Sequence, residues 1–189
     1  QRLYGFNFAK TLIPNLLMKG SFAFLDQASA PPRNGESFQN DFVSSIGLVA
    51  DPLNENWSFE GEYAHSHSDQ AVRGLIEYRP YWGKIIATYK RIGTNYVNLS
   101  QGFMLRDFQE ATFSANVQPY RRLGFYADYH FSQFGLGSVS PFTHSKTHST
   151  TVSSRFRKDS SNDYLGSITV IRSNGESSDQ QTEKGSFTY

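Results

Sequence analysis

The chain has 189 residues, a formal net charge of +1, and no cysteine. Its mean hydropathy is -0.52, so no segment approaches the roughly 20 apolar residues of a transmembrane helix. The balanced charge provides no field that would attract nucleic acid, and the lack of cysteine excludes a disulfide scaffold and a cysteine-ligated metal site.

Apolar and polar residues alternate along most of the chain, which is the period of a β-strand, and no segment has a convincing helical period. Most of the alternating segments are near ten residues long, about the length that a tilted strand needs to cross a bilayer. We expect about eleven strands, over residues 2–10, 16–27, 40–50, 57–68, 70–80, 83–93, 108–118, 122–133, 148–157, 162–172 and 183–189.

The expected connections differ in length at the two ends of the strands. Those at one end are short, over 11–15, 52–56, 80–83, 119–122 and 158–163. Those at the other end are mostly long, over 28–39, 94–107, 134–148 and 173–182, with a short exception at 68–70. Short turns at one end and long loops at the other are typical of outer-membrane barrels.

The stretch 121–135 raises the question of which side of each strand meets water. Leu123, Phe125 and Phe131 share one parity, whereas Asp128 and His130 share the other. We interpret the apolar parity as lipid-facing, because it carries more aromatic bulk than a small closed interior readily holds. The ionised residues at mid-strand would be solvated in a wet lumen. A soluble barrel that binds an apolar ligand would have the reverse arrangement and is an alternative.

The same parity rule sorts the side chains of the other strands. The expected lipid-facing set includes Phe6, Phe8, Phe22, Phe42, Ile46, Leu48, Phe59, Val72, Ile76, Ile85, Phe113, Val117, Phe156, Ile168 and Val170. The expected lumen-lining set is Glu60, Glu62, Arg73, Glu77, Arg79, Lys84, Lys90, Glu110, Asn116, Gln118, Asp128, His130 and Arg155. Acids and bases balance in the lumen set, which predicts no strong preference for anions or cations.

Aromatic residues gather near both ends of the expected strands, as in the rings that anchor barrels at the headgroup levels. The expected membrane-interface aromatics are Trp57, Tyr81, Trp82, Tyr120, Phe131 and Tyr189. Tyr4, Phe24, Tyr89, Phe108 and Phe134 are expected near the long-loop end.

Together these features make the chain resemble a bacterial outer-membrane β-barrel of the porin-like kind. The end of the chain adds to the resemblance, because Gly185, Phe187 and the terminal Tyr189 share one parity and such barrels typically finish on an aromatic residue. The resemblance implies an all-β, antiparallel up-and-down transmembrane β-barrel in the outer membrane, with the lipid bilayer as a partner.

Because such barrels normally have an even strand number and periplasmic termini, we expect residues 1–189 to form a single barrel domain that lacks at least one N-terminal strand. The smallest complete barrel would then have twelve strands. Alternatively, the chain is a segment of a larger barrel.

Two small groups of residues could carry chemistry. Asp128 could orient the imidazole of His130 so that it acts as a general base, as in the Asp-x-His pair of the omptin proteases. Omptins also need a second acidic pair, and Glu60 and Glu62 have that spacing but start from the periplasmic end. We therefore interpret Asp128 and His130 as lumen-lining residues.

The segment "HSHSD" at 65–69 places His65, His67 and Asp69 at one parity. Two imidazoles and a carboxylate can bind zinc or copper. An isolated His-x-His has no further ligand spacing to support a metal site, so we interpret the segment as a polar strand end and expect no metal.

The sequence thus favours a pore or channel wall for small polar solutes. The alternative is a barrel component of a larger secretion or surface assembly with other outer-membrane or periplasmic subunits. An omptin-like hydrolase and a soluble ligand-binding barrel are further alternatives. We expect no cofactor and no nucleic-acid partner; enzymatic activity stays open, with a non-enzymatic role favoured.

Overall fold

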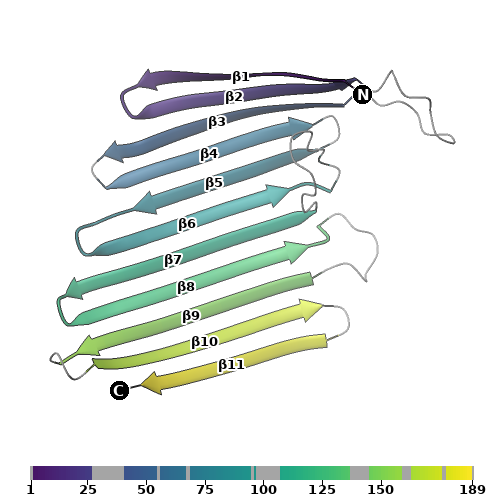
Figure 1. Cartoon of the computed structure of the whole chain (residues 1–189). Helices are drawn as coiled ribbons and strands as arrows, with labels where there is room; N and C mark the ends of the chain where they lie inside the picture. Colours follow the sequence, from purple (N-terminus) through teal and green to yellow (C-terminus); the bar gives the residue numbers. More distant parts are fainter. Residues whose placement is uncertain are drawn as a thin grey trace.

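The computed structural model describes residues 2–26, 41–54, 56–66, 69–94, 96, 107–136, 145–158, 163–175 and 178–188. These residues form one sheet in which every strand pairs with its neighbours in the chain (Figure 1). All neighbouring pairs are antiparallel. The strands are β1 (Arg2–Ile13), β2 (Leu16–Asp26), β3 (Asp41–Asn54), β4 (Trp57–Ser66), β5 (Gln70–Tyr78), β6 (Gly83–Ile92), β7 (Phe108–Tyr120), β8 (Leu123–Phe134), β9 (Ser145–Arg157), β10 (Asp163–Gly175) and β11 (Ser178–Thr188).

The predicted all-β, up-and-down antiparallel architecture is therefore confirmed, with a strand in each of the eleven predicted places. The sheet is open: β1 and β11 are its edges and do not pair with each other. Barrel closure and membrane insertion stay predictions. Among the described residues, no helix is long and apolar enough to cross a membrane.

The connection between β10 and β11 was predicted wrongly as a long loop over 173–182. Gly175 pairs with Ser178, so only two residues separate the two strands, and β11 begins at Ser178 instead of residue 183. The segment 178–182 is polar and lacks apolar alternation, yet it extends the backbone pairing with β10. Hydrogen bonding to an existing edge is enough to hold a polar segment as a strand.

Cross-strand pairing shows which side chains share a face, because residues directly opposite one another point to the same side of a sheet. Phe6 pairs with Phe22, and the rings of Phe6, Phe22 and Phe42 follow one another across β1, β2 and β3 at centroid distances of 5.7 and 6.4 Å. Farther along, Ile76 pairs with Ala87, and Ala87 with Phe113. The expected lipid-facing residues all lie on this one side, which we call the apolar face.

The opposite side, which we call the polar face, carries the expected lumen-lining residues of β4 to β9. Glu62 pairs with Arg73, and Arg73 with Lys90. Lys90 then pairs with Glu110. The separation of faces is weakest at β11, where Gln181 and Glu183 are the register partners of Arg172 and Val170 on the apolar face.

The apolar face is not covered by a second layer in the part of the chain that the structure describes. Many of its large side chains are exposed, among them Phe6 (62% exposed) and Ile168 (63%). The buried hydrophobic residues among the described ones are Ala50, Ala64, Ile92, Tyr96 and Phe108. The Phe and Ile side chains of the apolar face therefore do not converge on a closed core.

Aromatic residues gather near both ends of the strands, and their place at a membrane interface stays a prediction. At the short-turn end, Trp57 stacks on Tyr78 at 4.4 Å, and Tyr78 lies 6.3 Å from Trp82. Tyr81 in the β5–β6 turn and Tyr120 at the end of β7 are exposed. At the other end, the Phe131 ring lies 4.9 Å from His148 on the apolar face, while Tyr189 falls outside the described residues.

Phe108 and Phe134 correct the expected aromatic belt. Phe108 pairs with Phe134 and with Ile92, so all three belong to the polar face. The two rings lie 4.8 Å apart, and Phe108 is buried. They pack against each other across the ends of β7 and β8 instead of pointing to the apolar face.

We predict that Gly83→Ala destabilises the sheet and that Gly74→Ala does not. A Cβ at Gly83 would lie 2.3 Å from the Asn116 carbonyl oxygen, whereas a Cβ at Gly74 would meet nothing within 4 Å. Backbone atoms cannot yield as a flexible side chain can, so Gly83→Ala should cost about 1–3 kcal/mol. Urea unfolding of the purified protein in detergent, followed by circular dichroism, measures both variants. Equal midpoints for the two would contradict the close approach of β6 and β7.

Candidate functional site

The polar face of the sheet is the candidate functional surface, and an ion-paired group near its short-turn end contains the buried carboxylate among the described residues. Glu77, near the end of β5, has a side chain only 10% exposed. Its carboxylate accepts a hydrogen bond from Nε of Arg79 and lies 2.7 Å from Nζ of Lys84 at the start of β6. The turn 79–82 folds β6 back beside β5, so one carboxylate pairs with two cations and the group keeps one net positive charge.

Looser ion pairs follow on the neighbouring strands. Arg73 Nη2 lies 3.9 Å from Glu60 Oε1, and both side chains are substantially exposed. His130 Nδ1 lies 3.6 Å from Glu110 Oε1 across β7 and β8. Solvent-exposed pairs of this kind contribute little stability, but they distribute opposite charges along the face.

Hydroxyl groups connect adjacent strands between these charges. Ser21 and Ser45 hydroxyls lie 2.7 Å apart, and those of Thr88 and Thr112 lie 2.5 Å apart. Thr151 and Thr169 make a similar contact at 3.1 Å. Our sequence prediction of the lumen named mainly charged residues and missed these pairs, although the alternating Ser and Thr of the same parity were the available signal.

The Asp128 and His130 pair is not assembled into a hydrolase site. Both residues lie on the polar face of β8, opposite Ser114 and Thr112 of β7. The ion-pair contact of His130 is with Glu110. Glu60 and Glu62, the only candidates for a second acidic pair in the prediction, lie on β4, well separated from β8 in the strand order.

Hydrogen bonds join Ser66, at the end of β4, to Asp69, just before β5. Ser66 N donates to the Asp69 carbonyl oxygen at 2.8 Å, and the Ser66 hydroxyl contacts the same oxygen at 3.0 Å. His65 is directed to the apolar face, where its ring lies 6.0 Å from Phe42. His67 is outside the described residues, and those that are described contain no group of three or more potential ligands for a metal ion.

Tyr96 covers part of the polar face at the long-loop end, which the sequence did not predict. It is buried against Ala64 and Ile92, with Val43 and Ala71 packed around them. Its backbone N donates to the Gly93 carbonyl oxygen at 3.3 Å. Burial, aided by the negative charge of Glu62, raises the pKa of the Tyr96 phenol. The start of the β6–β7 connection therefore lies on the polar face.

The remaining predicted residues also lie on this face or beside it. Asn116 is exposed near the end of β7, and Gln118 follows it, donating through Nε2 to the Arg121 carbonyl oxygen at 3.3 Å. Arg155 of β9 forms an ion pair with Asp163 at the start of β10. Comparison of the chain with family models, with curated proteins and with solved structures gives no match.

We predict that Glu77→Gln destabilises the protein more than Glu60→Gln. Removing the Glu77 charge takes the shared anion from Arg79 and Lys84 and leaves an uncharged amide at the enclosed position of the Glu77 side chain, and breaking an ion pair with one enclosed partner costs on the order of 1–3 kcal/mol. The Glu60 pair with Arg73 is long and exposed, so its loss should cost less than about 1 kcal/mol. Urea unfolding midpoints measure the difference, and an equal shift for both variants would contradict the structural role of Glu77.

Proposed function

We propose that this chain forms the wall of a bacterial outer-membrane β-barrel whose interior passes small polar solutes. The observation that carries the proposal is the separation of faces across β1 to β10. One side of a single-layer sheet is apolar and exposed, and the other carries ion pairs and hydroxyl groups.

An exposed apolar face of this extent needs an apolar environment that covers it. Soluble monomers rarely expose contiguous apolar patches larger than a few hundred Å², whereas large apolar side chains are exposed here from Phe6 in β1 to Ile168 in β10. Full burial of one such side chain is worth about 1.5–3 kcal/mol. Acyl chains would supply that burial along every strand at once.

The strand lengths fit a bilayer. The strands run from 9 residues in β5 to 14 in β3. Ten residues at about 3.3 Å each span about 33 Å, and a tilt near 45° reduces this to about 23 Å across the membrane. This is close to the apolar band of transmembrane barrels.

The charged side chains on the apolar face of β1 to β10 also fit this location. Lys10, Arg91, Lys146 and Arg172 lie toward strand ends. Lys146 lies 5.7 Å from the Phe131 ring centroid, in a cation–π contact. Basic residues beside aromatic rings at strand ends are the arrangement expected at headgroup level.

A pore requires the sheet to close. β1 and β11 run in the same direction (Figure 1), so pairing them directly would give a parallel contact. Closure by antiparallel pairs alone needs an odd number of strands between β11 and β1, and we propose at least one. The smallest barrel would then have twelve strands, in agreement with the even number usual for bacterial barrels.

The open edges also favour a second candidate, a barrel component of a larger outer-membrane assembly. In that case another chain would supply the closing strand or strands. Such a complex would co-purify with partner chains in fixed stoichiometry, whereas a free-standing pore would not.

We predict that the purified protein, reconstituted in a planar lipid bilayer, gives discrete current steps with little selectivity between small cations and anions. The weak selectivity follows from the balanced acids and bases of the predicted lumen set. Reversal potentials in a salt gradient measure the selectivity. Insertion without any current would contradict the pore and leave the assembly component as the better proposal.

We also predict that Phe113→Arg impairs membrane insertion and that Ser114→Arg is tolerated. The two residues are neighbours near the middle of β7 but lie on opposite faces. An arginine on the lipid side near the bilayer centre costs about 2–4 kcal/mol, while one on the polar face would be solvated near Asp128, the partner of Ser114. The heat-modifiable band of folded protein in native-like electrophoresis reports insertion. Loss of that band in Ser114→Arg but not in Phe113→Arg would reverse the assignment of the faces.

A further inference from the structure

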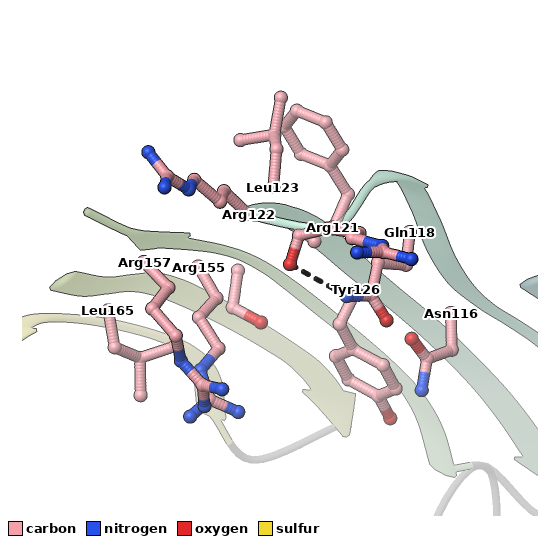
Figure 2. Close-up of a pocket in the computed structure, with 12 residues that line it drawn as sticks. Asn116, Gln118, Arg121, Arg122, Leu123, Tyr126, Arg155, Arg157 and Leu165 are labelled. Carbon is pink, nitrogen blue, oxygen red and sulfur yellow. Dashed lines mark hydrogen bonds between the residues drawn. The ribbon is translucent and has the colours of Figure 1, made fainter. Parts of the chain in front are cut away.

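Arginines gather at the short-turn end of the polar face, in the β7–β8 turn and along the facing ends of β9 and β10. Arg121 and Arg122 form the turn, and Arg155 and Arg157 end β9 (Figure 2). These four side chains line a cavity of about 450 Å³ together with Tyr126 and neighbouring residues. We call this the arginine pocket.

Backbone and ion-pair contacts fix the β7–β8 turn against β9 and hold Arg155 and Arg157 beside each other, whereas the guanidinium groups of Arg121 and Arg122 lie farther from this pair (Figure 2). Arg157 N donates to the Arg122 carbonyl oxygen at 2.8 Å, which fixes the β7–β8 turn against β9. Arg155 Nε donates to both Asp163 carboxylate oxygens, at 3.0 and 2.9 Å. Arg157 Nη2 lies 3.5 Å from the same carboxylate, and Figure 2 shows the two guanidinium groups side by side.

Positive charge exceeds negative charge at this part of the polar face. The segments 116–126 and 153–165 contain Arg121, Arg122, Arg155, Arg157 and Lys158 against Asp159 and Asp163, an excess of three positive charges. The guanidinium groups of Arg155 and Arg157 are about half exposed, at 55% and 53% of their side chains. Among the described residues, Arg121 and Arg122 have no ion-pair partner.

We propose that the arginine pocket binds a phosphate group carried by a small organic molecule or a lipid headgroup. Guanidinium groups present paired N–H donors that match phosphate oxygens, and closely spaced arginines are the usual protein solution for this anion. Leu165 lines the same cavity beside Arg155 and Arg157 and offers apolar contact to the organic part. The site does not depend on pore formation, because its donors belong to one end of four paired strands.

Titration of the protein in uncharged maltoside micelles with glycerol 3-phosphate tests the soluble source. Calorimetry should detect saturable binding that weakens at least tenfold in Arg121→Gln and in Arg157→Gln. Arg157→Lys should weaken binding less, because it keeps the charge but loses the paired donors. Lys184→Gln, which removes one exposed cation from the polar face of β11, should leave the affinity unchanged.

Native mass spectrometry of the protein purified with phosphatidylglycerol tests the lipid source. Retention of this lipid by the parent protein and by Lys184→Gln, but not by the Arg121→Gln/Arg157→Gln double variant, would assign the phosphate to a headgroup. The proposal is overturned if neither probe binds, or if the Lys184→Gln control loses binding as much as the arginine variants do. Unfolding midpoints equal to the parent's would show that any loss of binding is not a loss of fold.

Discussion

The structure depends on the fixed alternation of side chains along each strand together with the register of each pairing. A shift of one residue in any pair would bring the aromatic residues of one strand beside the acids and bases of the next. The register shifts within β1–β2, β3–β4 and β7–β8 all lie at the short-turn ends, after Thr11, Ala50 and Val117. The middle of every pair is therefore regular, and the two faces remain separate across β1 to β10.

This alternation is local in sequence, which explains why the strands and their faces could be predicted from it. Features that depend on a partner strand were harder to predict. The start of β11 is polar, and only pairing with β10 makes it a strand. In the sequence, Phe108 and Phe134 look like aromatic residues of a membrane interface. Phe108 lies opposite Ile92 on one side and opposite Phe134 on the other, however, and this pairing places both rings on the polar face.

The contacts on the polar face follow the same logic. Residues i and i+2 of one strand lie about 7 Å apart, and diagonal neighbours on adjacent strands lie about as far apart but within reach of long side chains. The Asp-x-His spacing brought Asp128 and His130 to one face, but His130 contacts Glu110, its diagonal neighbour on β7. Likewise, Glu77 is neutralised by Lys84 only because a turn returns the chain beside β5, and the arginine pocket combines a turn with the ends of other strands. Side chains that meet across strands or turns leave little trace in the spacing of one segment.

The two free edges constrain the proposed membrane location. An edge strand the length of β1 leaves about half of its backbone N–H and C=O groups without a sheet partner. In water these groups bond to solvent, but in hydrocarbon each would cost several kcal/mol, so an open sheet of this size is not stable within a bilayer. If the apolar face lies in lipid, β1 and β11 must therefore both be paired there. The lipid contact and the closure of the sheet are thus one physical requirement, and a stable, monomeric form of the chain in water with both edges open would count against both.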